Sequence, residues 1–299
     1  MQPKIGDQVE ISIKEKTYQG KLMPESNGVV MIKLDSGYNI GFEKKKIKEI
    51  KLLKSSKLKT KEKQTELKIN KDLKKITILH TGGTFASKVD YEQGGVSALF
   101  SPQELIHLFP KLKDIANIQS KLIFNMFSSN MRFAHFNVIA KEIKAQANKT
   151  DGIIITIGTD NLATAAAALT FMIDNLPIPV IIIGAQRSSD RPSSDAHLNM
   201  ICAAQFIVKT EFTGIAICMH KSTNDTSCYI LPSTKTKKLH TSRRDAFKPV
   251  NARPFAEIYP DGKCIIITKF HPKPTAPLTV SYIDENLKIV CYTDHQIFE

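Results

Sequence analysis

The residue types best suited to nucleophilic attack and proton transfer here are threonine, aspartate and lysine. Thr84 and the pair Thr159-Asp160 each stand just past a predicted buried strand, and Lys238 lies downstream in an irregular basic stretch, 235–247. A threonine hydroxyl is a poor nucleophile until a neighbouring group takes its proton, and a buried lysine oriented by a carboxylate can do that. The combination predicts a site with the division of roles of a catalytic triad, built from Thr84, Thr159, Asp160 and Lys238.

Alternating strands and helices must position these side chains. The pattern predicts strands over 76–80, 152–157 and 180–183. It also predicts one helix that starts at the Ser101-Pro102 cap and two further helices over 134–147 and 163–175. This order predicts a parallel sheet with helices on both faces and a site outside the carboxyl ends of its strands. A further strand predicted over 122–127 would bring Ser128 to the same edge.

The first 50 residues have a different pattern. Short strands are predicted over 9–13, 18–22, 29–34 and 38–42, with tight turns between them. Four or five such strands predict a small SH3-like β-barrel over residues 1–50, followed by a lysine-rich linker over 51–75. Barrels of this kind position or bind other molecules, and we find no catalytic constellation in this one.

The net charge of +13 is concentrated in one segment. Residues 44–75 hold 14 lysines and four acidic residues, a net charge of +10, so that the other 267 residues carry +3. One interpretation is a solvated linker extended by self-repulsion, and the other is an arm that contacts nucleic-acid phosphates. The segment has no arginine and no interleaved aromatic residue, which disfavours base-specific recognition.

Several other classes of protein are not supported. The five cysteines are scattered and form no CxxC pair, and the eight histidines show no metal-ligand spacing. Dinucleotide, P-loop, zinc-protease and serine-elbow motifs are absent from the sequence. No apolar run reaches the length of a membrane span, so we expect a cytoplasmic protein without a bound metal or membrane.

Three motifs carry a resemblance to a known family. The segments TGGT (81–84), GTD (158–160) and GAQR (184–187) resemble the signatures of the bacterial-type L-asparaginase fold, from about residue 76 onward. The longer runs GAQRSSDRPSSD (184–195) and LHTSRRDAF (239–247) resemble more narrowly the D-subunit family of archaeal glutamyl-tRNA(Gln) amidotransferases. That family also carries a small barrel in front of its asparaginase-like part.

The resemblance implies a glutaminase half-reaction within a larger complex. The D subunit hydrolyses glutamine, and the ammonia passes to the E subunit, which uses ATP with Mg²⁺ to convert Glu-tRNA(Gln) to Gln-tRNA(Gln). A heterotetramer of two D and two E subunits is implied, with no cofactor bound by the D subunit. The implied roles are nucleophile for Thr84, proton handling for Thr159, Asp160 and Lys238, and substrate binding for Tyr91 and Ser128.

The sequence departs from the family at two points. The family reads His-Gly-Thr-Asp-Thr where this chain has Ile157 and Asn161 at the outer positions, so altered support around retained chemistry is expected. The asparaginase-like part is expected over 76–285, and 286–299 would begin a C-terminal subdomain that is truncated here. Two alternatives to an amidotransferase subunit stay open. One is a stand-alone asparaginase or glutaminase of amino-acid catabolism, and the other is a non-catalytic assembly piece, which the expected truncation suggests. The intact Thr84, Asp160 and Lys238 argue against the second.

Overall fold

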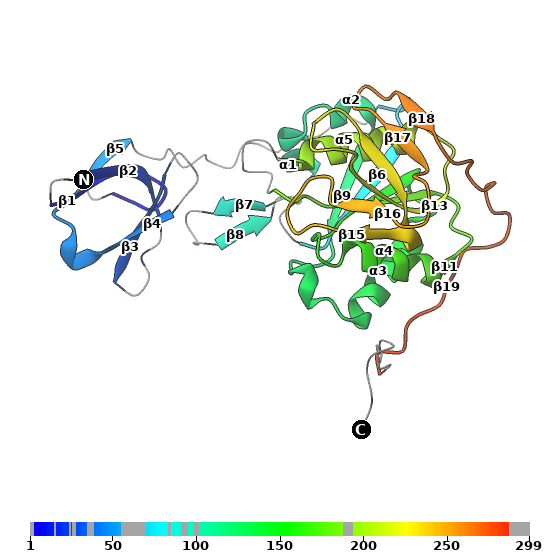
Figure 1. Ribbon diagram of the computed structural model, residues 1–299, viewed down its shortest axis with the longest axis horizontal. Helices are drawn as coiled ribbons and strands as arrows, with labels where there is room; N and C mark the ends of the chain where they lie inside the picture. Colours follow the sequence, from blue (N-terminus) through cyan, green and yellow to red (C-terminus); the bar gives the residue numbers. More distant parts are fainter. Residues whose placement is uncertain are drawn as a thin grey trace.

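The computed structural model of the chain describes residues 3–14, 16–23, 25, 28–34, 39–54, 70–82, 85, 87–90, 95–98, 102–187 and 194–286. A small N-terminal sheet precedes a larger unit of alternating strands and helices (Figure 1). No described helix has the length and apolar character needed to cross a bilayer. The four described cysteines are free thiols.

The predicted small β-domain is present as a five-stranded antiparallel sheet. Its strands lie in the order β4-β3-β2-β1-β5 and cover, in chain order, Gln8–Ile13, Lys16–Leu22, Val29–Lys33, Asn39–Glu43 and Glu49–Lys54. Alternate apolar residues form its core, namely Val9, Ile11, Val30, Ile32 and Phe42. These core residues belong to neither core cluster of the larger unit.

The predicted linker begins too early. Residues 51–54 complete β5, which pairs with β1 and places Leu52 opposite Val9. Ile50 packs on the core of the small sheet, and this contact holds the strand despite its flanking lysines. Residues 55–69 of the predicted linker lie outside the described part of the chain.

An eight-stranded sheet organises the larger unit. Its order is β18-β17-β14-β13-β12-β10-β6-β9. The strands are β6 (Lys75–His80), β9 (Asn117–Leu122), β10 (Gly152–Thr156), β12 (Pro179–Ile183), β13 (Gly214–His220), β14 (Cys228–Pro232), β17 (Ala256–Ile258) and β18 (Cys264–Ile266). The five strands from β13 to β9 are parallel, as predicted, and the three at the other edge are antiparallel.

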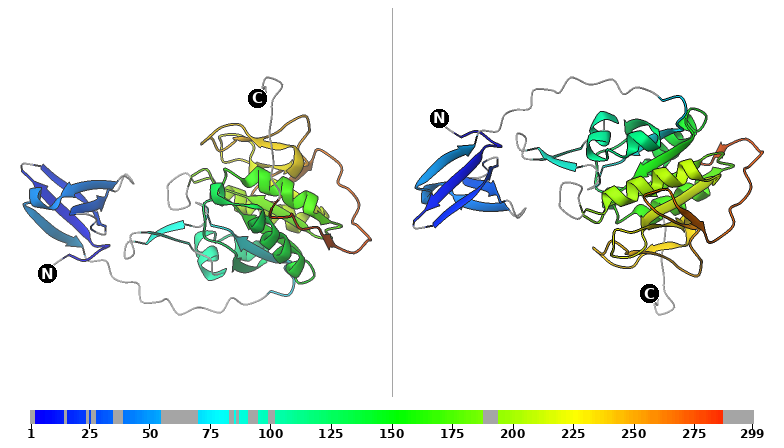
Figure 2. Two further views of the ribbon diagram at one scale, coloured as in Figure 1. Left: turned by 90° about the horizontal axis from the view of Figure 1, so that it is seen from below. Right: turned by 90° about the horizontal axis from the view of Figure 1, so that it is seen from above.

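Helices cover both faces of this sheet (Figure 2). Isoleucine-rich strands such as β10 and β12 are buried along their whole length, because successive side chains enter opposite cores. One face packs against α1 (Pro102–Leu108), α2 (Leu112–Ile115) and α5 (Ala196–Lys209). The other face packs against α3 (Phe133–Gln146) and α4 (Leu162–Met172).

Short elements complete the unit at its margins. Three two-stranded pairs join β7 (Ser87–Asp90) to β8 (Gly95–Ala98), β11 (Ile173–Asp174) to β19 (Thr279–Val280) and β15 (Thr236–Lys238) to β16 (Phe247–Pro249). Single 3₁₀ turns cover Lys44–Lys46, Ser128–Asn130 and Ser233–Lys235. The α4 helix ends at Met172 and not at residue 175, because the two residues of β11 pair with β19.

The strand predicted over 122–127 is wrong. The β9 strand pairs with β6 only as far as Leu122, opposite His80. The backbone N–H groups of Ile123 and Phe124 then both donate to the His80 carbonyl, at 2.7 and 3.2 Å, and the chain leaves the sheet. Ile123, Phe124 and Met126 pack against the core below, so their apolar character reflects loop packing and not a strand.

Candidate active site

Three neighbouring strand ends create the edge at which the candidate residues gather. The strands β12, β10 and β6 are consecutive in the sheet. Thr81, directly after β6, donates its backbone N–H and its hydroxyl to the Thr156 carbonyl at 3.2 and 2.9 Å. Ile157 donates its N–H to the Ile183 carbonyl at 2.9 Å. The chain segments that leave the three strands therefore start side by side, as the sequence predicts.

Lys238 reaches this edge from a distant part of the chain. It is the last residue of β15 and lies opposite Phe247 of β16. Its Nζ atom lies 2.9 Å from Thr159 Oγ1 and 2.9 Å from Asp160 Oδ1. The structure therefore brings three of the four predicted catalytic residues into hydrogen-bond contact.

The three side chains differ in their access to water. The Lys238 side chain is 16% exposed, whereas that of Asp160 is 71% exposed. A lysine Nζ atom that faces two oxygens in a mostly buried position is held in place by a hydrogen bond to each of them. Because Thr159 accepts a bond from Lys238, the proton of its own hydroxyl is free to point toward a third group. This arrangement can pass a proton between that third group and the lysine.

Ser128 supports the loop that carries Thr159 and Asp160. Its hydroxyl accepts the backbone N–H of Asn161 at 3.3 Å, and the Asn161 side chain donates to the Ser128 carbonyl at 2.6 Å. Gly158 lies so close that a Cβ atom there would stand 2.7 Å from Ser128 Oγ. Ser128 is only 4% exposed, so its predicted contact with a substrate carboxylate stays a prediction.

The predicted nucleophile and lid residue, Thr84 and Tyr91, lie outside the described residues. The path toward Thr84 is described as far as Gly82, which has a φ of +97°. A Cβ atom at Gly82 would stand 2.4 Å from the backbone nitrogen of Met126, so no other residue fits there. Gly82, the first glycine of the TGGT motif, thus allows close backbone packing beside the strand end.

The last residue of the long motif 184–195 binds the backbone near the start of that motif. Asp195 is fully buried and accepts the backbone N–H groups of Gln186 and Arg187 at 3.0 and 2.9 Å. The Gln186 side chain donates to the carbonyl of Arg243 at 3.0 Å. This bond links the motif to the loop between β15 and β16, which begins directly after Lys238.

A second carboxylate organises that loop. Asp245 binds Arg243 through two bonds of 2.9 and 3.0 Å and Lys248 through one of 3.2 Å. Burial by itself raises the pKa of Asp245, but the hydrogen bonds from Arg243 and Lys248 outweigh it and hold the pKa below its ordinary value. The ion pairs between Asp245 and its basic neighbours thus stabilise the conformation of this loop.

Sequence reasoning missed the supporting residues. From the sequence, Asn161 stands out only as a departure from the family pattern, and no pattern assigns a role to Asp195, Asp225 or Asp245. Their signal was present, because each is an acidic or amide residue inside or next to a glycine-, serine- or arginine-rich loop motif. Such residues accept backbone N–H groups and stabilise turns.

The histidine next to the TGGT motif is packed and hydrogen-bonded. His80 is fully buried, and its Nδ1 atom lies 3.0 Å from Thr156 Oγ1. Burial lowers the pKa of His80 to about 4, so the ring is neutral near pH 7. Within the described ranges, no group of three histidine, cysteine or acidic side chains could hold a metal ion.

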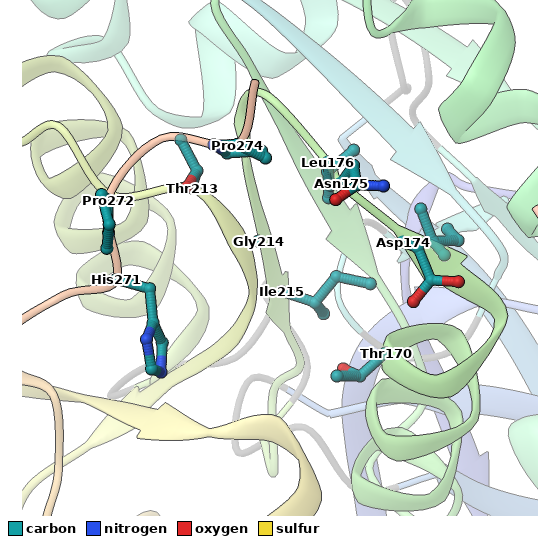
Figure 3. A pocket seen from close by; sticks show the side chains of 11 residues that line it. Thr170, Asp174, Asn175, Leu176, Thr213, Gly214, Ile215, His271, Pro272 and Pro274 are labelled. Atoms are coloured by element: carbon teal, nitrogen blue, oxygen red, sulfur yellow. The ribbon is translucent and has the colours of Figure 1, made fainter. Parts of the chain in front are cut away.

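The large sheet also borders a cavity of about 250 Å³, at the end away from the candidate active site. Figure 3 shows the side chains that line it. It is lined by Thr170, Asp174 and Asn175 near the end of α4, by Gly214 at the start of β13, and by His271. Gly214 pairs with Pro179, the first residue of β12. The cavity thus belongs to the amino ends of the strands, whereas Thr159 and Asp160 follow the carboxyl end of β10.

Comparisons with known families and proteins agree on the two parts of the chain. The family model Asparaginase, N-terminal, matches residues 75–270, and the model GatD N-terminal domain matches residues 4–53. The D subunit of glutamyl-tRNA(Gln) amidotransferase from Methanococcus maripaludis (strain C5) is 48% identical over 259 residues, which cover 86% of this chain and 62% of that protein. The protein of the same name from Methanococcus vannielii is 41% identical over 296 residues, which cover 95% of this chain and 69% of that protein.

Solved structures show the same fold. The thermostable L-asparaginase from Thermococcus kodakarensis superposes with a TM-score of 0.60 at 29% identity, covering 69% of this chain and 60% of that chain. L-asparaginase I from Vibrio cholerae superposes with a TM-score of 0.61 at 26% identity, covering 71% of this chain and 62% of that chain. The predicted asparaginase-like fold is therefore confirmed. The chain belongs to the asparaginase family and, within it, to the family of glutamyl-tRNA(Gln) amidotransferase D subunits.

Proposed function

We propose that this chain is the glutamine-hydrolysing subunit of a tRNA-dependent amidotransferase. The complex would convert Glu-tRNA(Gln) to Gln-tRNA(Gln), a carbon–nitrogen ligase reaction with glutamine as the amide donor. Two observations support this function. Lys238 contacts both Thr159 and Asp160 at the carboxyl edge of the sheet, and the relatives named above are D subunits of such complexes.

The proposed reaction proceeds in two half-steps at Thr84. Its hydroxyl oxygen attacks the side-chain amide carbon of glutamine, and the proton passes through Thr159 to Lys238 Nζ. The same proton is returned to the amide nitrogen, which leaves as ammonia. Water then attacks the acyl-threonine ester and loses a proton through Thr159 to Lys238. The same proton is returned to the Thr84 oxygen as the ester bond breaks and glutamate leaves.

Substrate binding falls to the more exposed groups. We assign the Asp160 carboxylate, which has one oxygen on Lys238, to the substrate amino group through its other oxygen. Ser128 would contact the substrate carboxylate and Tyr91 would close over the site. Backbone N–H groups after the strand ends would bind the developing oxyanion.

The remaining steps belong to a partner. Ammonia would pass to the E subunit of the amidotransferase, where ATP with Mg²⁺ activates the glutamate carried by the tRNA. The present chain itself would bind no cofactor, metal or membrane. The expected assembly is a cytoplasmic heterotetramer of two D and two E subunits, which sedimentation of the mixed proteins would test against a 1:1 complex.

Ammonia release from glutamine tests the proposal. It is measured for the chain alone and together with the E subunit and Glu-tRNA(Gln), beside Thr84→Ala and the control Thr275→Ala. Release that depends on the partner and the tRNA, is lost in Thr84→Ala and is kept in Thr275→Ala supports the gated glutaminase. We expect Thr84→Ala to lose more than the roughly 100- to 1000-fold typical for loss of one oxyanion donor.

One alternative has a specific observation in its favour. The solved structures named above are L-asparaginases, so a stand-alone asparaginase or glutaminase is the second candidate. Strong release of ammonia from asparagine or glutamine by the chain alone would establish it and overturn the gated function. No release in any mixture would favour the non-catalytic assembly role.

A further inference from the structure

A chain of hydrogen bonds runs from the loop after Lys238 into the interior of the large sheet. Arg244 Nη1 donates to Asp225 Oδ1 at 2.9 Å, and the same oxygen lies 3.0 Å from His220 Nε2. The other ring nitrogen, His220 Nδ1, lies 2.7 Å from Asn199 Oδ1. Asn199 Nδ2 in turn donates to the Gly184 carbonyl at 3.0 Å. Asn199 and His220 are buried, whereas Asp225 is half exposed.

The partners of His220 fix its protonation. The Gly184 carbonyl can only accept, so the Asn199 amide must present its NH₂ group there and its oxygen to His220. A carbonyl oxygen and a carboxylate both accept and do not donate. Each nitrogen of the ring therefore has to donate, and a histidine with two N–H groups is an imidazolium cation.

The surrounding groups suit a cation at this position. Burial by itself raises the pKa of Asp225. The hydrogen bond from His220 and the charge of Arg244 lower this pKa by more, so the net shift is downward and the carboxylate stays ionised. Burial raises the pKa of the Cys228 thiol well above its ordinary value, which keeps it a neutral donor to Asn199 Oδ1 at 3.3 Å. Asp195 lies one contact away, 3.5 Å from Asn199 Nδ2.

The inner end of this chain lies against the candidate active site. A Cβ atom at Gly184 would stand 3.0 Å from Thr159 Cγ2 and 2.9 Å from the Ile157 carbonyl. The outer end, Arg244, lies in the loop that starts directly after Lys238. The hydrogen bonds thus set the distance between the strand end beside Thr159 and the loop beside Lys238. The bond from Gln186 to the Arg243 carbonyl joins the same two segments a second time.

We propose that His220, Asp225 and Arg244 are positioning residues, in which a doubly protonated His220 bridges Asn199 and Asp225 and thereby holds Lys238 within reach of Thr159 and Asp160. The catalytic consequence rests on the proposed function. The protonation of His220 does not, because it follows from the hydrogen-bond partners alone.

The first test reads the protonation of His220 directly. Long-range ¹H–¹⁵N spectra of the full chain with ¹⁵N-labelled histidine distinguish an imidazolium from either neutral tautomer, and backbone correlations assign His220 without a variant. We expect both ring nitrogens to carry protons in the folded chain and the signals to change in Asp225→Asn. A neutral tautomer in the wild-type chain would overturn the proposal, whether or not the chain hydrolyses glutamine.

The second test reads the position of Lys238 through catalysis, in the complex with the E subunit and Glu-tRNA(Gln). We expect Asp225→Asn to lower kcat by roughly 10- to 100-fold with KM nearly unchanged, because a small misplacement of a catalytic group has effects of that size. The matched control is Asp114→Asn, an exposed aspartate on α2. Arg244→Lys should lose less than Arg244→Met, because it keeps the charge next to Asp225.

The outcomes separate two failures. An active wild-type complex in which Asp225→Asn keeps its kcat would overturn the positioning role. A wild-type complex that releases no ammonia contradicts the proposed function, and the spectra then still decide the protonation of His220.

Discussion

Two basic stretches of the chain, 44–54 in the small sheet and 235–248 in the larger unit, hold their charges in different surroundings. In the first, Lys44 pairs with Glu25, and the two side chains are 67% and 44% exposed. In the second, Arg243 and Lys248 pair with Asp245, whose side chain is 10% exposed, and Lys238 is itself mostly buried. Each of these pairs in the second stretch thus has one mostly buried member, which fixes the local conformation, whereas both members of the Lys44–Glu25 pair are solvated.

The largest effect is expected at Lys238, because it contacts both predicted proton-handling partners. Lys238→Met should lower glutamine hydrolysis by at least about 1000-fold, with thermal unfolding close to that of the wild type. The matched control is Lys237→Met, an exposed neighbour on the same strand. Equal loss in both variants would show that the stretch acts through general charge and not through one contact.

A smaller effect is expected at Asp245. Asp245→Asn should lower the free energy of unfolding by about 1–3 kcal/mol, because it leaves Arg243 and Lys248 with a weaker acceptor. The folded-state pKa of Asp245 is depressed, so its contribution is present above its unfolded pKa and is lost as the pH falls through the folded value. Urea unfolding at several pH values should show the two proteins converging in acid; a constant difference would contradict this account.

The lysine-rich segment between the small sheet and the larger unit is expected to contact tRNA, if at all, through its charge alone. Charge reversal at Lys57, Lys59 and Lys61 should weaken tRNA binding by roughly three- to tenfold near physiological salt and flatten its dependence on salt concentration. Filter binding of the complex over a salt series measures both. Unchanged binding would return the segment to a plain solvated linker.

The smallest effect is expected in the small sheet. Glu25→Gln removes the partner of Lys44, and the change in the free energy of unfolding should stay below about 1 kcal/mol because both groups are solvated. Denaturant unfolding in low and high salt measures it. A loss as large as that of Asp245→Asn would erase the difference between the two basic stretches.

The sequence located the strand ends well and the loops poorly. The strands predicted over 76–80, 152–157 and 180–183 lie where β6, β10 and β12 are found, to within one residue or so at each end. Runs of buried β-branched residues specify such strands locally. The strand predicted over 122–127 is wrong, because apolar residues that pack from a loop give the same local pattern as a strand.

The candidate site, too, was only partly predictable from the sequence. The sequence alone determined which residue types are available, namely Thr159, Asp160 and Lys238, and it showed the two long motifs that contain Asp195 and Asp245. Only the tertiary structure decided that Lys238 Nζ stands 2.9 Å from both partners and that His220 faces two acceptors. The physical reason is that strand pairing and core packing bring together residues far apart in the chain, and no local pattern encodes their distance.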